Sequence, residues 1–559
     1  MRVLGIEGTA WCASAALYDS ETDSVGIKSD AYVPESGGIH PREAAEHMRS
    51  AIPAVVETIL DESDGQIDAV AFSRGPGLGP CLRIVGSAAR ALAQTLDVPL
   101  VGVNHMVAHL EIGRHRSGFD APVCLNASGA NAHVLAYRNG RYRVLGETMD
   151  TGVGNALDKF TRHVGWSHPG GPKVEAHAKD GEYIDLPYVV KGMDFSFSGI
   201  MSAAKQEYDS VRASDASTGS SREQGERNGS TAVEDVCRGL EETMFAMLAE
   251  VAERALSLTG RDELVLGGGV AQNDRLRGML EAMCEQRGAD FFAPEPRFLR
   301  DNAGMIAVLG EKMARAGDTL DIENSAIDSN FRPDEVPVTW REPEPPARPD
   351  SDVLQGAEAT VTFENDHVTK ARLPKAYRHP SLDARLRRDR TVLEARLTSE
   401  ARRHGVPTPL VWDIDVPEST LTLQHVGDTD LRDALTESRV RDVGRHLATI
   451  HDAGFVHGDP TTRNVRVTAK RSRNERAGSE ATRERDGDDR TFLIDFGLGY
   501  NTDDVEDHAM DCHVFEQSLA GTADDPEPLT VAFEAAYREA GDESVLDQLR
   551  AIEGRGRYQ

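Results

Sequence analysis

Two histidines stand four residues apart in Val103-Asn104-His105-Met106-Val107-Ala108-His109-Leu110-Glu111. In an α-helix, His105 and His109 lie one turn apart on the same face, where two imidazoles can bind one metal ion. The chain has 18 histidines in 559 residues, so this spacing also arises by chance, as two partly exposed helix histidines. A metal site further requires a third ligand and a substrate site nearby.

A third ligand is available in Arg300-Asp301-Asn302-Ala303-Gly304-Met305, where an acidic residue precedes an apolar helix. Asp301 could serve only as the N-terminal cap of that helix. Alternatively, it completes a His/His/carboxylate set that leaves open coordination positions on a metal. Both interpretations stay open from the sequence.

Two similar strand-turn-strand units predict a duplicated α/β core. Residues 3–6 and 13–18 flank Glu7-Gly8-Thr9, and residues 122–137 contain a second such unit around Ser128-Gly129-Ala130-Asn131. Backbone N–H groups in small-residue turns can approach phosphate oxygens closely. One such turn is therefore expected to face phosphate in each half of the core.

Further glycine turns indicate a nucleotide-like ligand. Residues 264–273 form an apolar strand that ends in three glycines before a helix, which lets a flat ligand lie on the backbone, although a simple tight turn would look the same. Asp158 and Glu175 each follow a glycine turn and could accept hydrogen bonds from ribose hydroxyls.

Length and composition limit the class of protein. At roughly 150 residues per domain, 559 residues suggest three or four domains. The net charge of −31 predicts a salt-rich cytosol, because the Debye length falls to roughly 3 Å near 1 M salt. The six cysteines are far apart, which favours buried free thiols over disulfides. With no signal peptide and no long apolar run, we expect a cytoplasmic protein without membrane segments.

Seven motifs follow one another in the first 330 residues: Glu7-Gly8-Thr9, Asn104-His105-Met106-Val107-Ala108-His109, Ser128-Gly129-Ala130-Asn131, Gly170-Gly171-Pro172, Phe195-Ser196-Phe197-Ser198-Gly199, Gly268-Gly269-Val270-Ala271 and Asp301-Asn302. In their identity and order, these motifs resemble the universal tRNA threonylcarbamoyladenosine synthase family, the catalytic subunit of the KEOPS complex in archaea and eukaryotes.

This resemblance implies an actin/Hsp70-like (ASKHA) fold of two lobes. It also implies transfer of threonylcarbamoyl from its adenylate to N6 of the adenosine 3′ of the anticodon, in tRNAs that read ANN codons, with release of AMP. His105, His109 and Asp301 would bind iron or zinc. The adenylate would be bound by a second set of residues: Asn126, Ala127, Ser128, Gly129, Ala130, Asp158, Gly171, Glu175 and Asn273.

One position departs from the family pattern. Archaeal members have a metal-binding Tyr where this chain has Asn126. A carboxamide is a neutral and weaker ligand than a phenolate, so this position bears on which metal binds. A Lewis-acid role can survive the change, because it depends on open coordination positions more than on a phenolate.

A second set of motifs follows in the C-terminal part. His457-Gly458-Asp459-Pro460-Thr461-Thr462-Arg463-Asn464 and Leu493-Ile494-Asp495-Phe496-Gly497 reproduce a protein-kinase catalytic loop and metal-binding motif. Asp459 would orient the acceptor hydroxyl, while Asn464 and Asp495 would bind Mg²⁺ of ATP. Lys370 is the predicted phosphate lysine, with Glu394 or Glu400 as its partner. The short loop Gln355-Gly356-Ala357-Glu358-Ala359 replaces the usual glycine-rich loop.

These motifs resemble the small atypical serine/threonine kinase of KEOPS, over residues 352–559 and including Arg555-Gly556-Arg557-Tyr558. The chain is thus similar to an archaeal fusion of a transferase domain (1–330) with an α+β kinase or ATPase domain (352–559), joined by a proline-rich linker (331–351). Polar insertions predict disorder at 210–231 and 469–490. Expected partners are tRNA, the small dimerising and tRNA-tail-binding KEOPS subunits, and the separate enzyme that makes the adenylate.

Alternative functions remain for each half. The histidine pair invites a metalloprotease, but Met106 stands where HExxH has its glutamate. The C-terminal half could be a scaffold, a kinase for separate proteins, or an ATPase that regulates the transferase. Fusion fixes the halves at one-to-one stoichiometry, which favours the regulatory role.

The segment containing Arg385, Arg387, Arg388 and Arg390, with Arg402 and Arg403, could contact RNA phosphates or form an ion-paired surface.

Overall fold

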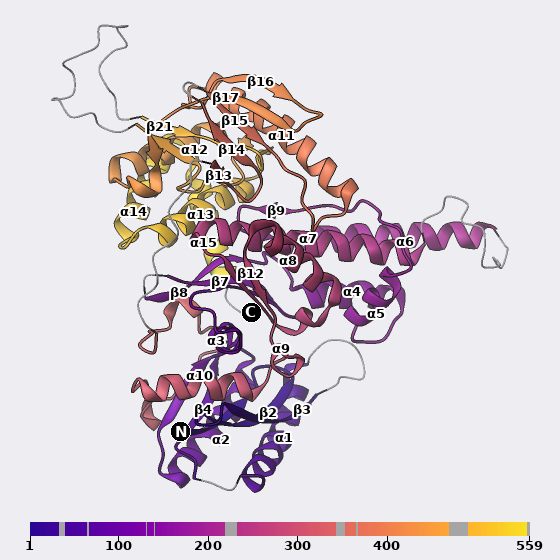
Figure 1. The fold of residues 1–559 in the computed structure, drawn as a ribbon, viewed down its shortest axis with the longest axis vertical. Helices are drawn as coiled ribbons and strands as arrows, with labels where there is room; N and C mark the ends of the chain where they lie inside the picture. Colours follow the sequence, from indigo (N-terminus) through magenta and orange to yellow (C-terminus); the bar gives the residue numbers. More distant parts are fainter. Residues whose placement is uncertain are drawn as a thin grey trace.

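The computed structural model describes residues 1–32, 40–63, 66–129, 131–138, 140–218, 232–341, 353–364, 367–468 and 490–555. Two α/β lobes come first along the chain, and a third part with its own sheet follows them (Figure 1). The indigo N-terminal lobe lies at the bottom of Figure 1, and the orange and yellow C-terminal part lies at the top. No helix among these residues is long and apolar enough to cross a membrane.

The first lobe contains a five-stranded sheet in the order β3-β2-β1-β4-β5. β1 pairs antiparallel with β2 and parallel with β4. The lobe comprises β1 (Arg2–Glu7), β2 (Cys12–Asp19), β3 (Ser24–Ala31), α1 (Pro41–Asp61), β4 (Ala69–Gly75), α2 (Gly79–Leu96) and β5 (Leu100–Asn104), and α10 (Ala303–Arg315) packs on its sheet.

The second lobe repeats this strand order, as β8-β7-β6-β11-β12. β6 is antiparallel to β7 and parallel to β11, as β1 is to β2 and β4. The predicted duplicated α/β core is therefore confirmed. Its strands and short helices are β6 (Val123–Ala127), β7 (Ala132–Arg138), β8 (Arg141–Glu147), β9 (Val190–Lys191), β10 (Asp194–Phe195), β11 (Glu263–Gly267), η1 (Gly269–Gln272), β12 (Asp290–Phe292) and α9 (Pro296–Leu299).

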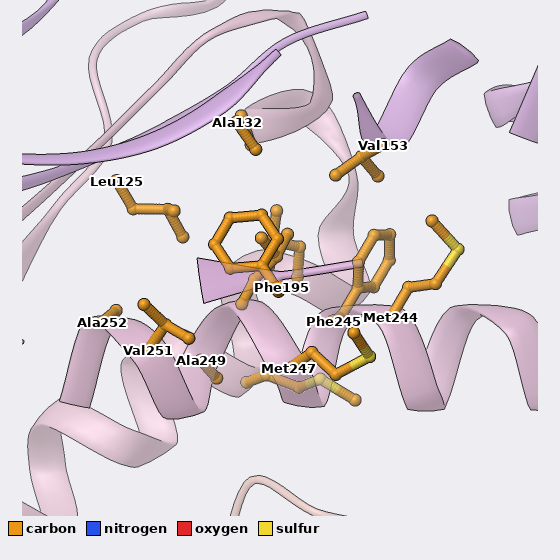
Figure 2. Close-up of a cluster of buried hydrophobic side chains, with 14 of the residues drawn as sticks. Leu125, Ala132, Val153, Phe195, Met244, Phe245, Met247, Ala249, Val251 and Ala252 are labelled. Carbon is orange, nitrogen blue, oxygen red and sulfur yellow. The ribbon is translucent and has the colours of Figure 1, made fainter. Parts of the chain in front are cut away.

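Helices α4 (Val153–Val164), α5 (Gly171–Ala178), α6 (Ser198–Thr218), α7 (Val233–Thr259) and α8 (Asp274–Arg287) complete the second lobe. Figure 2 shows part of the core around α7, in which Met244, Phe245 and Met247 belong to the same buried cluster as Leu125 and Phe195. Nearly every residue of α7 from Asp235 to Leu256 is buried, including every charged residue except Arg238. A helix buried on all sides lies in the interior of the molecule rather than on its surface.

The C-terminal part has a five-stranded antiparallel sheet and a helical region. The sheet order is β13-β14-β15-β17-β16, and α11 lies between β15 and β16 along the chain. These elements are β13 (Val353–Gln355), β14 (Thr360–Phe363), β15 (His367–Ala371), α11 (Pro380–Arg403), β16 (Val411–Asp415) and β17 (Thr420–Gln424). The rest comprises β18 (Thr429–Asp430), α12 (Glu437–Asp452), β19 (Phe455–Val456), β20 (Val465–Val467), β21 (Thr491–Leu493), β22 (Tyr500–Asn501), α13 (Val505–Thr522), α14 (Glu527–Ala540) and α15 (Glu543–Arg555).

Two predicted segment boundaries are wrong. Residues 331–341 are not part of an extended linker: Val336 is buried, Trp340 stacks on Tyr142, and Arg341 pairs with the buried Glu111. Apolar and cationic side chains between the prolines hold this segment on the first two lobes. Helix α6 also continues to Thr218, so 210–218 are helical. The rest of the linker, the rest of both predicted insertions except Arg490, and 556–559 lie outside the described residues.

All six cysteines are buried free thiols, as predicted.

Candidate functional site

The predicted histidine pair lies on α3 (His105–Ser117), which begins directly after β5. The side chain of Asn104 caps the helix by accepting hydrogen bonds from Met106 N and Val107 N. Gly118 ends it in the left-handed conformation at φ 74°. The predicted helix is thus confirmed, and both histidines are buried on it.

His105, His109 and Asp301 come together. The ring centroids of the two histidines are 4.9 Å apart. Asp301 Oδ1 lies 3.4 Å from His105 Nε2 and 3.6 Å from His109 Nε2. One ligand atom from each residue lies within 4.8 Å of the other two, as a metal ion would require. Asp301 does not cap α10, because the Asn302 side chain accepts the hydrogen bond from Met305 N.

Glu7, at the end of β1, also belongs to this cluster. Its Oε2 lies 3.1 Å from His105 Nδ1, and its Oε1 accepts a hydrogen bond from Thr9 N. A carboxylate on one ring nitrogen orients the other toward a metal. Burial would lower the pKa of His105, but the charge of Glu7 and the hydrogen bond with Asp301 raise it to about 10. Burial lowers the pKa of His109.

Asn126 connects the histidine cluster to the glycine turn after β11. Its Oδ1 is buried and has no hydrogen-bond partner within the described part of the chain, and the same holds for His109 Nδ1. A Cβ added to Gly268, at φ 85°, would lie 2.3 Å from Ala127 O and 2.6 Å from Asn126 Oδ1. Only glycine permits this close approach. The donor set and the unpartnered polar atoms fit a bound metal and ligand.

The remaining predicted ligand residues lie around the same turns. Asn155 N donates to Gly129 O, so the 128–131 turn packs on the start of α4. Asp158 Oδ1 accepts a hydrogen bond from Gly170 N, beside Gly171 at the start of α5. Glu175 accepts from Asp274 N, next to Asn273. Ala130 lies outside the described residues.

Asn273 is held by a residue that the sequence reading missed. Its Oδ1 caps α8, and its Nδ2 donates to Glu241 Oε1 at 2.9 Å. Burial raises the pKa of Glu241 to about 7. Nothing in the local sequence distinguishes Glu241 from the other acidic residues of α7, so only the fold reveals it.

The comparisons with known proteins decide the family. A family model described as tRNA N6-adenosine threonylcarbamoyltransferase matches residues 23–308. The chain belongs to this family. The N-terminal half is therefore called the transferase domain below.

Relatives of this transferase extend over the whole chain. A probable bifunctional tRNA threonylcarbamoyladenosine biosynthesis protein of Halobacterium salinarum is 75% identical and covers 100% of this chain and 99% of its own length. A protein of the same name from Haloarcula marismortui is 66% identical, with 100% of both chains covered. One from Methanospirillum hungatei is 48% identical, with 100% of this chain and 99% of the relative covered.

The C-terminal motif residues also meet in space. Lys370 Nζ lies 2.9 Å from Glu394 Oε1 and 2.6 Å from Asp495 Oδ1. Glu394 is thus the partner of Lys370, whereas Glu400 pairs with Arg403 and His404. Burial would raise the pKa of Asp495, but the charges of Lys370 and Arg372 hold it well below its ordinary value.

The predicted catalytic loop contacts the transferase domain. Asn464 Nδ2 donates to the Asp459 backbone O and to Asp459 Oδ2, and Arg254 of α7 lies 3.6 Å from the same Oδ2. Burial raises the pKa of Asp459. The sequence reading missed Arg254.

The short 355–359 loop lies beside the transferase domain as well. β13 pairs Gln355 with Thr360, and Gly356 N donates to Ala359 O. Ala357 lies inside this turn. The side chain of Glu358, predicted to face ATP, is instead paired with Arg378 and Arg390.

The proposed basic patch on α11 is not a free cationic surface. Arg390 is buried and pairs with Glu250 and Glu358. Arg385, Arg387, Arg388 and Arg403 each lie beside a carboxylate, and Arg402 donates to Thr408 O. The ion-paired alternative describes this helix.

Proposed function

We propose that the transferase domain moves a threonylcarbamoyl group from its adenylate to N6 of the adenosine 3′ of the anticodon, in tRNAs that read ANN codons. In this transfer, N6 forms a bond to the carbamoyl carbon, the bond from that carbon to the phosphate oxygen breaks, and AMP and the N6 proton leave. The observation that carries the proposal is the buried His105, His109 and Asp301 cluster beside the glycine turns, in a chain of this family. The relatives' names support the same product.

His105, His109 and Asp301 would hold the metal, iron or zinc. When bound, such an ion acts as a Lewis acid on a substrate oxygen. Glu7 orients His105 through Nδ1, and Asn126 places a neutral oxygen where the family has a phenolate. A neutral ligand leaves more positive charge on the ion.

The adenylate would lie on the turns at 126–130 and 267–269. Backbone N–H groups there can approach phosphate without a side chain in between. Asp158, Gly171, Glu175 and Asn273 would bind the nucleoside. Their hydrogen bonds to Gly170 N and Asp274 N fix the two carboxylates at helix starts.

The test is His109→Ala in the full chain. Threonylcarbamoyladenosine formation should be lost together with the bound metal, while circular dichroism stays unchanged. His163→Ala is the control, because His163 is a partly exposed histidine of α4 that pairs with Asp209 and packs on Tyr208. Full activity and unchanged metal content in His109→Ala would refute the metal assignment.

We further propose that residues 352–559 form an atypical kinase-like domain that binds ATP and Mg²⁺ and regulates the transferase by hydrolysing ATP. Lys370, Glu394 and Asp495 are in contact, and Asp459 and Asn464 share hydrogen bonds, as phosphoryl transfer requires. A serine/threonine kinase with separate substrates is the second candidate, because the same residues would serve it.

Asp459→Asn separates these candidates. A regulatory ATPase predicts that the variant loses ATP hydrolysis and multiple-turnover tRNA modification but keeps a single turnover. A separate kinase predicts undiminished modification in both regimes. The assay should contain the other KEOPS subunits and the adenylate-forming enzyme, which we propose as partners in the cytoplasm.

The repeated strand order supports an actin/Hsp70-like fold for the transferase domain, residues 1–330.

A further inference from the structure

Three arginines lie on one face of the hairpin formed by β7 and β8. The register pairs Arg138 with Arg141 and Ala136 with Arg143, and side chains that pair across two strands share a face. Ala136 and Arg138 also share a face, because they are two residues apart on one strand. Burial and the positive charges of Arg141 and Arg138 lower the pKa of Arg143. Like charges placed opposite each other destabilise a hairpin, so stability does not explain this arrangement.

These arginines have no acidic partners, although the chain has a large acidic surplus. In the part of the chain that the structure describes, no carboxylate oxygen lies within 4.0 Å of a nitrogen of these side chains. Arginines of α11 show the arrangement that 93 acidic against 62 basic residues would favour, since Arg387 pairs with Asp383 and Arg403 with Glu400. The hairpin arginines are therefore available to bind an anion.

The opposite face of the hairpin is fixed by burial. The Tyr142 hydroxyl donates to Glu111 Oε1 at 2.6 Å, and the Tyr142 ring stacks on Trp340. The Arg341 guanidinium lies 3.9 Å from the centroid of the Tyr137 ring. Because the hairpin backbone is held in place, a ligand that binds its arginine face orders only their side chains.

A cavity of about 850 Å³ lies beside the arginines, between β8 and α13. Arg138 and Arg143 line it, and so do Thr148 and Asp150, which follow the end of β8. At about 3.3 Å per residue, the cavity extends roughly 20 Å along this strand. Thr148 N donates to Ala132 O, directly after the 128–131 turn. The cavity thus leads from the arginines toward the turn proposed to hold the adenylate.

Other charged groups that line the cavity have partners. Lys191 pairs with Asp507, Arg332 pairs with Asp334, and Asp150 accepts hydrogen bonds from Phe197 N and Ser198 N. Asp504 and Glu506 on the α13 wall would repel a phosphate group. A polyanion in this cavity would therefore follow β8 rather than α13.

We infer that Arg138, Arg141 and Arg143 bind phosphate groups of the tRNA substrate, and that the RNA strand runs along β8 toward the transferase site. This inference rests on the proposed transfer, which requires a tRNA nucleoside to reach the metal cluster. A guanidinium group binds phosphate oxygens through two parallel hydrogen bonds. Phosphate contacts orient a nucleic acid without reading its sequence, so these arginines should determine tRNA affinity rather than the rate of the chemical step.

The test measures tRNA binding by the full-length protein over a KCl series. The probe is an unmodified transcript of a tRNA that reads an ANN codon, without the adenylate. In the triple variant Arg138→Gln, Arg141→Gln and Arg143→Gln, the Kd should rise at least tenfold. The slope of log association constant against log salt should flatten by about 2–3, because each lost phosphate contact removes roughly 0.7–0.9. Each single variant should flatten it by roughly 0.7–0.9.

Two further variants show whether charge at these positions is responsible. Lysine at all three positions keeps the charge, so the salt slope should stay near that of wild type. Arg403→Gln changes an exposed arginine of α11 that pairs with Glu400, and neither Kd nor slope should change. The unfolding temperature of the triple glutamine variant should not fall, because the substitutions relieve repulsion between like charges.

Transfer kinetics provide a separate readout. In the triple glutamine variant, the KM for tRNA should rise while kcat at saturating tRNA stays unchanged. An unchanged Kd and slope in this variant would overturn the inference, and so would an equal loss of tRNA binding in Arg403→Gln.

Pyrophosphate serves as a small-anion probe. Weaker pyrophosphate binding in the triple glutamine variant, with tRNA binding unchanged, would assign the arginines to a small anion and overturn the RNA assignment. A wild-type protein that binds tRNA as expected but forms no threonylcarbamoyladenosine would refute the proposed transfer and still support the RNA surface.

Discussion

At the residue scale, the glycine turn after β11 leaves no room for a side chain at Gly268, beside the proposed ligand site. Gly268→Ala should destabilise the transferase domain by at least ~1–2 kcal/mol, because φ is 85° and the new Cβ would overlap Ala127 O. Gly269→Ala is a matched control, since a Cβ there meets nothing within 4 Å. Thermal unfolding of both variants measures the difference. Equal unfolding temperatures would contradict the close packing of this turn.

Glu241 should make stability depend on pH. Burial raises its pKa from 4.5 to about 7, so the native state keeps the proton longer than the unfolded chain. This group therefore lowers the free energy of unfolding by ~3 kcal/mol as pH rises from 4.5 through 7. Glu241→Gln stays neutral and keeps an oxygen for Asn273 Nδ2.

The unfolding free energy of Glu241→Gln, relative to wild type, should consequently increase between pH 4.5 and pH 8. Scanning calorimetry across this range measures it. Glu285→Gln, on the exposed face of α8, should show no such trend. A difference that does not vary with pH would mean that Glu241 is charged in the native protein throughout.

The metal cluster illustrates what single residues reveal in a sequence. The spacing of His105 and His109 predicted a shared helical face, because i and i+4 side chains must be neighbours there. Asp301 was a candidate from its place before an apolar helix, but the sequence left its role open, since an acidic residue there can also serve as a helix cap. Glu7 looked like part of a turn. Its contact with His105 depends on how β1 and α3 pack, which no local pattern encodes.

At the scale of elements, α7 carries several buried ion pairs between the halves. Glu253 accepts from Lys375 Nζ at 2.6 Å and from Tyr377 OH at 3.0 Å. Glu253→Ala should cost ~3–5 kcal/mol, because it leaves Lys375 buried without its carboxylate partner. Hydrogen exchange in α7 and the start of α11 should increase.

Glu234→Ala at the more exposed start of the same helix is the comparison, with an expected effect within ~0.5 kcal/mol. If the α7 amides exchange hydrogen equally slowly in Glu253→Ala and in Glu234→Ala, the buried pairs of Glu253 do not stabilise the contact between the halves.

Helices and strands with a clear apolar period could be predicted from the sequence, but the contact between α7 and the C-terminal part could not. The two hairpins, α3 and the strand before the glycines follow from alternation and helical spacing. The arginines of α11 and the glutamates of α7 have the composition of exposed helix faces, because charged residues are rarely buried. Each set becomes buried only in the presence of the other, 140 positions away in the chain for Glu250 and Arg390.

At the scale of the whole molecule, the net charge of −31 should make stability depend on salt. Screening weakens repulsion among surface carboxylates, and the Debye length falls from roughly 10 Å at 0.1 M to 3 Å at 1 M. We expect the unfolding temperature to rise with KCl, most steeply below about 0.5 M. Buried pairs such as Lys370 and Glu394 should contribute little to this rise. Calorimetry over a KCl series tests it, and a flat or falling curve would contradict it.

The charged face of α7 also matters while the protein is being synthesised. The transferase domain emerges from the ribosome first, and the remaining ~200 residues need roughly 10–40 s at 5–20 residues per second. During that time its docking face exposes carboxylates and guanidinium groups, next to a small apolar cluster around Ala246. Water solvates such a face well. The nascent first half therefore does not expose a large apolar surface that would aggregate with other incomplete chains before the second half is synthesised.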